Sequence, residues 1–226
     1  GVPTFYTRLL GRADFTSEAA RTIRLFISGS APLLPQTFAE FEARTGKRIL
    51  ERYGMTETGM ITSNPYEGER RAGSVGFPLP GVCVRVANPE TGAIVAQGES
   101  GVIEVNGPNV LSGYWNKPEL RQTEFRADGF FITGDLGTID GDGYVNIVGR
   151  AKDLIISGGL NVYPKEIETL IDGIEGVIES AVFGLPHPDF GEAVAASVVV
   201  AKGSNLEAEA IKCALAGELA NFKQPK

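Results

Sequence analysis

The chain has 226 residues, 42% of them apolar, and a formal net charge of −7. This length and apolar content are ordinary for a folded chain with a buried core, in one large or two modest domains. An acidic chain with interspersed lysines and arginines lacks the basic face that nonspecific nucleic-acid binding needs, so we expect no nucleic-acid partner. The longest apolar run, residues 193–201, is far shorter than the ~18 residues of a membrane span, so we expect no transmembrane segment.

Cys83 and Cys213 lie far apart in the sequence, so no disulfide is expected and a reducing, cytoplasmic compartment fits. Neither cysteine has a neighbouring base or metal-ligand spacing, so both are expected to pack. The only histidine, His187, is expected in a loop. The chain begins without methionine and stops just past a predicted helix, so we expect both ends to be cut and read no targeting segment.

Residues 1–72 predict a strand, helix, strand unit. The predicted elements are a helix over residues 4–10, a turn over 17–21, a buried strand over 23–28, a helix over 35–44 ended by Gly46, and a strand over 48–51. Phe38 and Phe41 share one face of the second helix. The loops GSAPL (29–33) and YGMTETG (53–59) follow the two strands. Loops at this edge of an open α/β sheet are where ligands bind.

From Gly73 onward the pattern becomes β-rich and predicts a small subdomain, either a distorted barrel or a sandwich. The predicted elements are strands over 82–87 and 101–105 with a turn at 88–92, a helix over 118–125, and a hairpin within 130–149. The hairpin is joined at Asp140-Gly141-Asp142-Gly143, where Asp and Gly supply positive φ.

The segment GRAKD (149–153) packs three charged residues together. They cannot all be buried, so a domain boundary is expected here. The predicted domains are therefore residues 1–151, divided at 72/73, and residues 152–226. The second domain is expected to be a small α+β fold lacking its closing segment, with strands over 154–157, 177–184 and 193–201 and helices over 164–171 and 206–220.

Four motifs carry a resemblance to a known family: YGMTET, TGDL (133–136), GRAKD and GGLNVYPKEIE (158–168). In this order and spacing they resemble the adenylate-forming superfamily of acyl-CoA synthetases, peptide-synthetase adenylation domains and luciferases. The resemblance covers essentially the whole chain. It implies an α/β fold class: the C-terminal part of a large AMP-binding domain with a small β subdomain, then a hinge and an incomplete small α+β domain.

The YGMTET loop offers an aromatic ring, a glycine for close approach, two hydroxyls and a carboxylate. Such a set can stack a base, donate to phosphate and hold a divalent ion. The alternative is a turn whose threonines bond their own backbone. The resemblance implies that Tyr53 packs on adenine beside Gly54, that Thr56 contacts the α-phosphate and that Glu57 ligates Mg²⁺. Met55 would face the acyl substrate, or else belong to the core.

A carboxylate is the natural acceptor for the two hydroxyls of a ribose. The resemblance assigns this role to Asp135, which could otherwise cap a turn. It gives Arg150 a donor role toward ribose or phosphate, although an exposed ion pair is an alternative. It also implies that Gly29-Ser30-Ala31 lies between adenine and the acyl pocket, where the alternative is an ordinary loop.

The resemblance implies two further roles, one at the hinge between the domains and one beside the thiol of coenzyme A. Lys152 matches the hinge position, where backbone rotation would swing the small domain between an adenylating and a thioester-forming pose. The alternative is an uneventful linker lysine. The resemblance implies that Gly158 and Gly159 line the passage for the pantetheine arm of coenzyme A.

The implied reaction is a two-step ligation of a carboxylic acid to coenzyme A with ATP and Mg²⁺. The segments RLFISGSAPLL (24–34), LERYGMTET (50–58), GPNVLSGYW (107–115) and GGLNVYPKEIE together resemble the malonyl-CoA synthetases, which take small dicarboxylic acids. The second carboxylate of such a substrate would need a cation from Arg24, Arg52 or elsewhere. A medium- or long-chain fatty acid ligase is the first alternative, and a noncatalytic adenylate-binding or carrier-docking module is the second. The phosphate loop and the catalytic lysine are expected outside residues 1–226, so this piece alone is predicted to be nearly inactive. The oligomeric state stays open.

Overall fold

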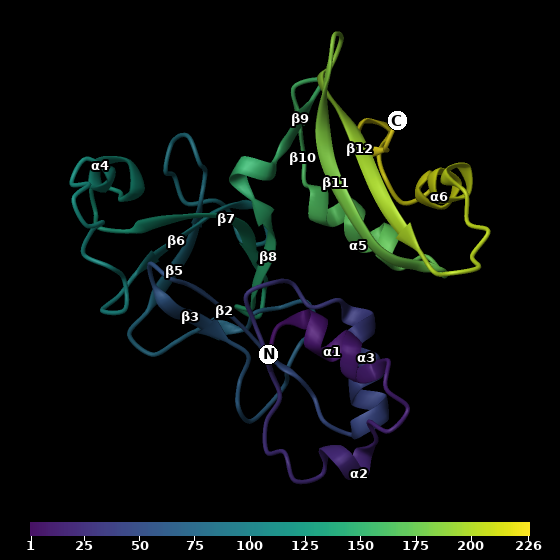
Figure 1. Ribbon diagram of the computed structural model, residues 1–226. Coiled ribbons are helices and arrows are strands. Elements are labelled where there is room, and N and C mark those ends of the chain that lie inside the picture. Colours follow the sequence, from purple (N-terminus) through teal and green to yellow (C-terminus); the bar gives the residue numbers. More distant parts are fainter. The chain divides into compact units, whose positions relative to one another are not determined.

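The computed structural model describes residues 1–226. The chain separates into two compact units, Gly1–Ile147 and Val148–Lys226, which Figure 1 shows in purple to green and in green to yellow. The sequence places a boundary four residues later, after residue 151. Each unit has its own sheets and core.

The start of the first unit contains the predicted strand, helix, strand arrangement. Its elements are α1 (Pro3–Leu10), α2 (Ser17–Ala20), β1 (Ile27–Ser28), α3 (Pro35–Thr45) and β2 (Leu50–Met55). β1 and β2 are parallel, so both strands end at the same edge, as predicted. Phe38 and Phe41 of α3 are both buried, and the ring of Phe41 packs edge-on against Phe26 at 4.8 Å between centroids. α3 ends at Gly46, whose φ of +68° is left-handed. The predicted strand over 23–28 is wrong in extent, because only its last two residues pair.

The predicted loop over residues 53–59 is largely wrong. β2 continues to Met55 and pairs with antiparallel β3 (Gly59–Ser63), so only residues 56–58 form a turn. A methyl group at Gly54 would lie 2.2 Å from the carbonyl oxygen of Gly59. Gly54 is therefore required by the close crossing of this hairpin. A short strand that the sequence did not predict, β4 (Phe77–Pro78), completes a sheet of order β1-β2-β3-β4.

The β subdomain is one open sheet of order β5-β6-β7-β8, rather than a closed barrel. Its strands are β5 (Cys83–Ala87), β6 (Gly101–Asn106), β7 (Phe131–Ile139) and β8 (Val145–Arg150), with α4 (Leu120–Glu124) before β7. The predicted β7–β8 hairpin is confirmed: the side chain of Asp140 accepts from the backbone of Asp142 and Tyr144, and Gly143 has a φ of +87°. The core joins this sheet to the first one, since Ile61 packs with Ile103 and other β-sheet residues.

One ionised cluster is buried in this sheet. Glu104 of β6 is fully buried, and its two carboxylate oxygens accept from Arg85 at 2.7 Å and Arg126 at 2.6 Å. Arg85 also pairs with Asp128 and lies 3.8 Å over the ring of Phe130. Two cations therefore compensate the buried carboxylate.

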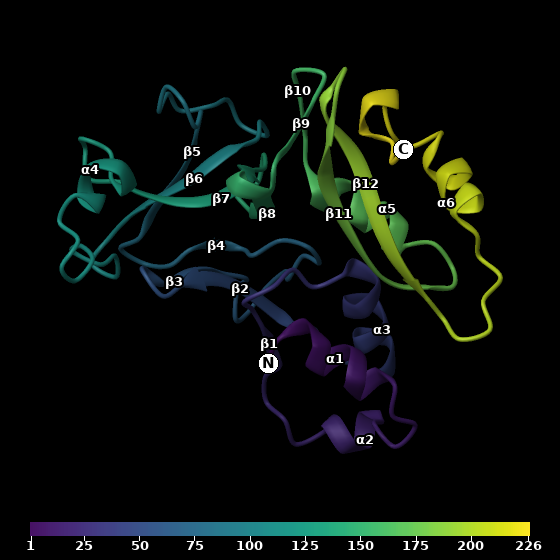
Figure 2. The ribbon, with the colours of Figure 1, turned by 45° about the horizontal axis from the view of Figure 1, so that its top comes forward.

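The second unit is a four-stranded sheet with helices on one face. Its elements are η1 (Ala151–Asp153), β9 (Ile155–Ser157), β10 (Leu160–Val162), α5 (Pro164–Asp172), β11 (Val177–His187), β12 (Gly191–Val200), α6 (Ala208–Leu215) and η2 (Asn221–Lys223). The strand order is β10-β9-β12-β11. Figure 2 shows α5 behind β11 and β12, with α6 beside them. Ile167 and Ile171 of α5 and Leu215 of α6 are buried in the shared core with Ile155 and Val182.

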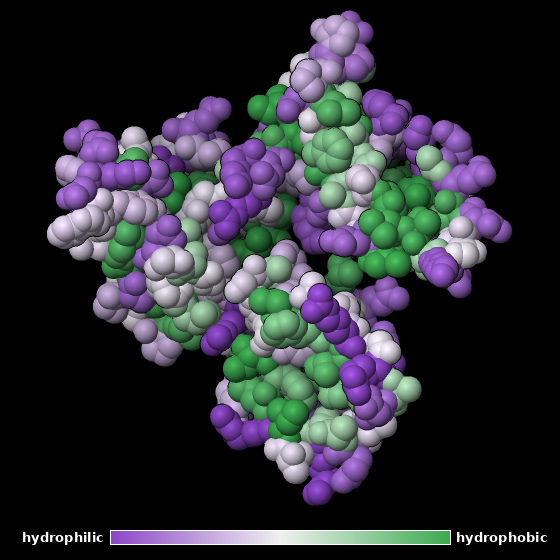
Figure 3. All heavy atoms as spheres, viewed as in Figure 1, coloured by the Kyte–Doolittle hydropathy of each residue, from purple (hydrophilic) through white to green (hydrophobic).

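Several predicted details of this unit are corrected. β10 was not predicted, and α6 is shorter than the helix expected over 206–220, because the chain leaves the helix after Ala216. His187 is the last residue of β11 rather than a loop residue, and its ring stacks on Phe190. The long apolar run is the strand β12, and Figure 3 shows apolar side chains gathered over it next to α6. None of the helices combines the length and the apolar character that crossing a bilayer requires.

Candidate functional site

The centre of the candidate site is the contact between Tyr53 and Asp135, 82 residues apart in sequence. The phenol of Tyr53, on β2, donates to the carboxylate of Asp135, on β7. Asp135 is 4% exposed. Its backbone N–H donates to Oγ1 of Thr133 at 3.1 Å, and that hydroxyl donates to the carbonyl of Ile103 at 2.8 Å. The β-rich sheet thus holds the Asp135 carboxylate against the strand that carries YGMTET.

The turn at Glu57 is held by a loop that the sequence analysis did not assign to the site. The hydroxyl of Tyr114 donates to Oε1 of Glu57 at 3.3 Å, and the N–H of Leu111 donates to the Glu57 carbonyl at 2.8 Å. The side chain of Asn109 donates to the carbonyl of Thr58 at 2.7 Å. Desolvation, followed by the charges of Glu57 and Glu124, raises the pKa of Tyr114, so its hydroxyl stays a donor at neutral pH. The sequence feature that could have indicated this loop is the set of glycines and aromatic residues in GPNVLSGYW (107–115).

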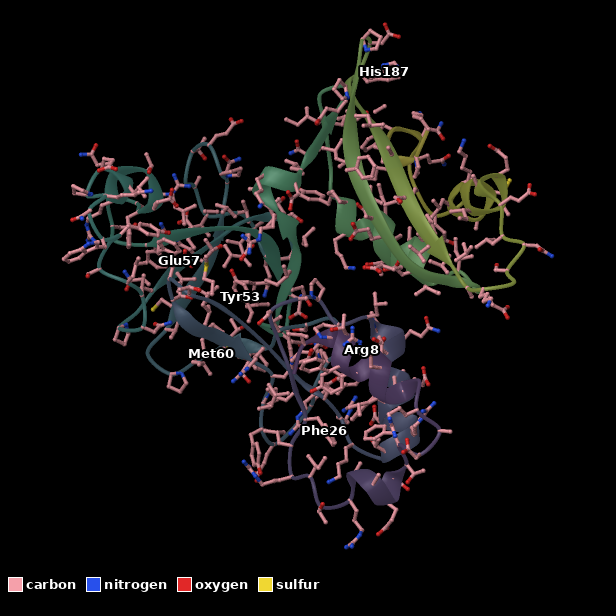
Figure 4. All side chains as sticks on the ribbon, in the orientation of Figure 1. Arg8, Phe26, Tyr53, Glu57, Met60 and His187 are labelled. Atoms are coloured by element: carbon pink, nitrogen blue, oxygen red, sulfur yellow. The ribbon has the colours of Figure 1, made fainter.

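The other YGMTET residues lie around this turn. Figure 4 shows Tyr53 and Glu57 in the same region of the first unit. Thr56 is exposed in the turn itself, whereas Met55 is half-buried at the end of β2 and pairs with Gly59. The hairpin therefore keeps Thr56 accessible to a ligand.

The predicted loop at residues 29–31 lies beside the same strand. A methyl group at Gly29 would lie 3.2 Å from the carbonyl oxygen of Arg52, the residue before Tyr53. Ser30 has a φ of +68°, which a residue with a side chain rarely adopts, and Ala31 is exposed. Such backbone strain is found preferentially at ligand sites. The first unit thus gathers the Gly29–Ala31 loop, the YGMTET hairpin and Asp135.

Four of the predicted site residues belong to the second unit. Arg150 is the last residue of β8, Lys152 lies in η1, and both are exposed, as expected for the charged segment. Gly158 and Gly159, with φ of +60° and +80°, form the two-residue turn between β9 and β10. A tight hairpin requires this geometry, so the two glycines have a structural reason to be here, and their role beside the pantetheine arm stays a prediction.

Gly158 is also tied to the β11–β12 hairpin. Its N–H donates to the carbonyl of Phe190 at 2.8 Å. The ring of Phe190 is 42% exposed and lies in van der Waals contact with the site of a Gly158 side chain. Sequence reasoning did not single out this phenylalanine.

The donor set suits magnesium only with help from a phosphate. No group of three or more histidine, cysteine, aspartate or glutamate side chains is placed so that it could hold a metal ion. Mg²⁺ is commonly held by one or two carboxylates together with substrate phosphates and waters, so the single carboxylate of Glu57 fits that role.

The two cysteines take no part in the site. Cys83 and Cys213 are both free thiols, one in each unit. Both are exposed, so the expectation that they pack in a core is wrong.

Comparisons with known proteins identify the family. The sequence model for AMP-binding enzymes matches residues 1–115, and the model for the AMP-binding enzyme C-terminal domain matches residues 166–226. The chain belongs to the AMP-binding enzyme family. The predicted superfamily and fold class, the end of the large domain followed by the C-terminal domain, are therefore confirmed.

Three relatives illustrate the similarity. ATP-bound MatB from Rhodopseudomonas palustris is 60% identical to the chain with a TM-score of 0.98, over 100% of this chain and 45% of that one. A feruloyl-CoA synthase of Amycolatopsis sp is 40% identical over 100% of the chain and 46% of the relative. A malonate–CoA ligase of Arabidopsis thaliana is 42% identical over 88% of the chain and 34% of the relative. The chain thus spans less than half the length of each of these relatives.

Proposed function

We propose that the protein to which this chain belongs is an AMP-forming acid–CoA ligase that acts on malonate or a similar small dicarboxylic acid. The observation that carries the proposal is the contact of Tyr53 with Asp135 beside the Gly29–Ala31 loop. It brings an aromatic ring and a carboxylate together, the groups that adenine and ribose need. The 60% identity to a protein solved with ATP bound supports the same ligand.

The nucleotide is assigned to the first unit. Tyr53 and Gly54 would lie along adenine, opposite the backbone of Gly29, Ser30 and Ala31. Asp135, already held by backbone and hydroxyl contacts, would accept from the ribose hydroxyls. Arg150, which belongs to the second unit, keeps its predicted donor role toward ribose or phosphate.

The phosphates are assigned to the turn of the β2–β3 hairpin. The exposed hydroxyl of Thr56 would donate to the α-phosphate. Glu57, oriented by Tyr114, would hold Mg²⁺, which when bound neutralises phosphate charge. These residues orient the α-phosphorus for in-line attack.

In the first step a carboxylate oxygen of the acid attacks the α-phosphorus, and the bond to pyrophosphate breaks. This yields the acyl-adenylate and pyrophosphate. In the second step the sulfur of coenzyme A attacks the acyl carbonyl, the bond to AMP breaks, and the thiol proton is released to solvent. Rotation at Lys152 would separate the two steps, and Gly158 and Gly159 would line the thiol passage in the second.

The cation for a second substrate carboxylate is assigned to Arg52. Its Cγ lies 3.5 Å from the site of a Gly29 side chain, so it borders the loop expected beside the acyl pocket. Arg24 is already engaged: it donates to the hydroxyl of Tyr66 at 2.8 Å and lies 5.4 Å from the centre of that ring. An arginine is suited to planar, bidentate recognition of a carboxylate.

The test uses the complete reading frame that contains the chain, with residues 1–226 alone in parallel. Pyrophosphate release is compared with malonate, methylmalonate, acetate and octanoate, and malonate is expected to be fastest. Faster turnover of octanoate would refute the dicarboxylate assignment. Absence of any nucleotide-dependent release would favour the noncatalytic module. Residues 1–226 alone are expected to release almost none.

A pair of arginine variants tests the acyl pocket. Arg52→Gln should lower kcat/KM for malonate by roughly 100-fold, the loss of a charge-assisted hydrogen bond, and change acetate little. Arg24→Gln is the matched control and should leave both substrates unchanged. Equal losses for malonate and acetate in the Arg52 variant would contradict the assignment.

A further inference from the structure

Glu51 is a buried carboxylate that the proposed mechanism does not use. It is the second residue of β2, is 5% exposed, and stands opposite Ser28 in the parallel pair of β1 and β2. It therefore lies at the edge of the sheet from which the Gly29–Ala31 loop leaves, two residues before Tyr53.

The Glu51 carboxylate joins two segments that are distant in sequence. The N–H of Gly73 donates to Oε1 at 3.1 Å. The backbone of Leu33, two residues after Ala31, also faces this carboxylate and lowers its pKa. Leu33 belongs to the loop between β1 and α3, whereas Gly73 follows β3. One side chain thus fastens the far end of the Gly29–Ala31 loop.

The main chain of Glu51 also binds a third segment, at Asn64. Its carbonyl accepts from the backbone N–H of Asn64 at 2.9 Å and from the side-chain amide of the same residue at 3.2 Å. Asn64 also donates to the carbonyl of Ser74 at 2.6 Å. The segment that carries Gly73 is therefore itself held in place, so it forms a firm support for the carboxylate.

Stability alone does not explain a carboxylate here. Its donor, the N–H of Gly73, is a backbone amide, and burial raises the pKa of Glu51 to about 7, with the backbone contacts from Gly73 and Leu33 opposing the rise. Keeping the group ionised at neutral pH therefore costs folding free energy. Strongly perturbed carboxylates of this kind concentrate at functional sites.

We infer that Glu51 is a positioning residue for the nucleotide: by accepting from Gly73 and facing the backbone of Leu33, it holds the Gly29–Ala31 loop in the conformation that lies along adenine. Ser30, with its left-handed φ, is the strained point of that loop. Releasing Leu33 lets the strain relax and moves the loop away from the ring of Tyr53. The inference rests on the function proposed above.

Two measurements test it, on Glu51→Ala and the nearly isosteric Glu51→Gln. The first is amide hydrogen exchange of residues 29–34 and 71–75 by NMR on the chain. Exchange of the Leu33 and Gly73 amides should accelerate about 10-fold in the alanine variant and less in the glutamine variant, whose side-chain oxygen still accepts. The control is Glu42→Gln, which removes a carboxylate on α3 that pairs with Arg48 at 3.1 Å and should leave these amides unchanged.

The second measurement is steady-state kinetics of the complete enzyme. KM for ATP should rise about 10-fold in Glu51→Ala while kcat stays within about twofold, because a misplaced adenine loop weakens ground and transition states alike. Unchanged KM in an active enzyme would overturn the positioning role alone, as would unchanged Leu33 and Gly73 exchange. A wild-type enzyme without ATP-dependent pyrophosphate release would instead refute the proposed function, and the inference with it. Should the alanine variant not fold, the glutamine variant decides: amide exchange and KM that both match those of Glu42→Gln would overturn the positioning role.

Discussion

As the pH rises, the free energy of unfolding of the Glu51→Gln variant should increase relative to that of the wild-type chain. Burial raises the pKa of Glu51 from 4.5 to about 7 in the folded chain. Between these values the folded state keeps a proton that the unfolded state has released. The stabilisation that this more tightly held proton gives the folded wild-type chain is therefore complete below pH 4.5. It is lost as the pH rises through 7. A difference of 2.5 between 7 and 4.5 corresponds to about 3 kcal/mol at 1.36 kcal/mol for each pKa unit.

The assay is urea denaturation followed by far-UV circular dichroism at pH 5, 6, 7 and 8. The difference in free energy of unfolding, Glu51→Gln minus wild type, should grow by roughly 2 to 3 kcal/mol from pH 5 to pH 8. Glu42→Gln, which removes the α3 carboxylate that pairs with Arg48, is measured in parallel as the matched control. A difference for Glu51→Gln that stayed constant, or that shrank as the pH rose, would refute the assignment of a buried carboxylate with a raised pKa. The same variant is expected to bind ATP less well, so stability and function would change in opposite directions.

The remaining predictions concern two other buried features of the first unit. Gly54→Ala should destabilise this unit by at least about 2 kcal/mol, since its methyl group would collide with the carbonyl of Gly59; a thermal melt that matched wild type would contradict the close crossing of β2 and β3. Glu104→Ala should cost about 3 kcal/mol by urea denaturation, because the cations of Arg85 and Arg126 lose their shared carboxylate. A loss below ~1 kcal/mol there would mean that water compensates the two arginines.

Local patterns were sufficient for elements whose cause is local. The β7–β8 hairpin follows from Asp140 and Gly143, since a side-chain acceptor and a positive φ determine the turn within four residues. α3 follows from its leading proline, the spacing of its phenylalanines and the glycine that ends it. The parallel arrangement of β1 and β2 follows from the helix between them, because such a connection returns the chain in the same direction.

Patterns misled where a distant or unexpected partner decides the structure. YGMTET has the composition of a loop, yet β2 runs through Met55 because β3 offers it a partner and Gly54 permits the close crossing. β10 was missed for a similar reason: Gly158 and Gly159 were expected to make room for a ligand, whereas their positive φ values turn the chain back onto β9. In both places a glycine could be assigned to the protein or to a ligand, and only the pairing of the strands distinguishes the two.

The same limit explains why Glu51 escaped sequence analysis while Asp135 did not. Asp135 sits in TGDL, a motif whose resemblance to the family is enough to assign the residue a role. Glu51 lies among charged and polar residues, a pattern that indicates an exposed strand end. Its burial depends on Leu33 and Gly73, which come from two other segments. Its pKa is consequently a property of the tertiary structure and of no local pattern. Residues that position a ligand through the backbone amides of other loops will generally have this character, so they are best sought among buried carboxylates without a cation.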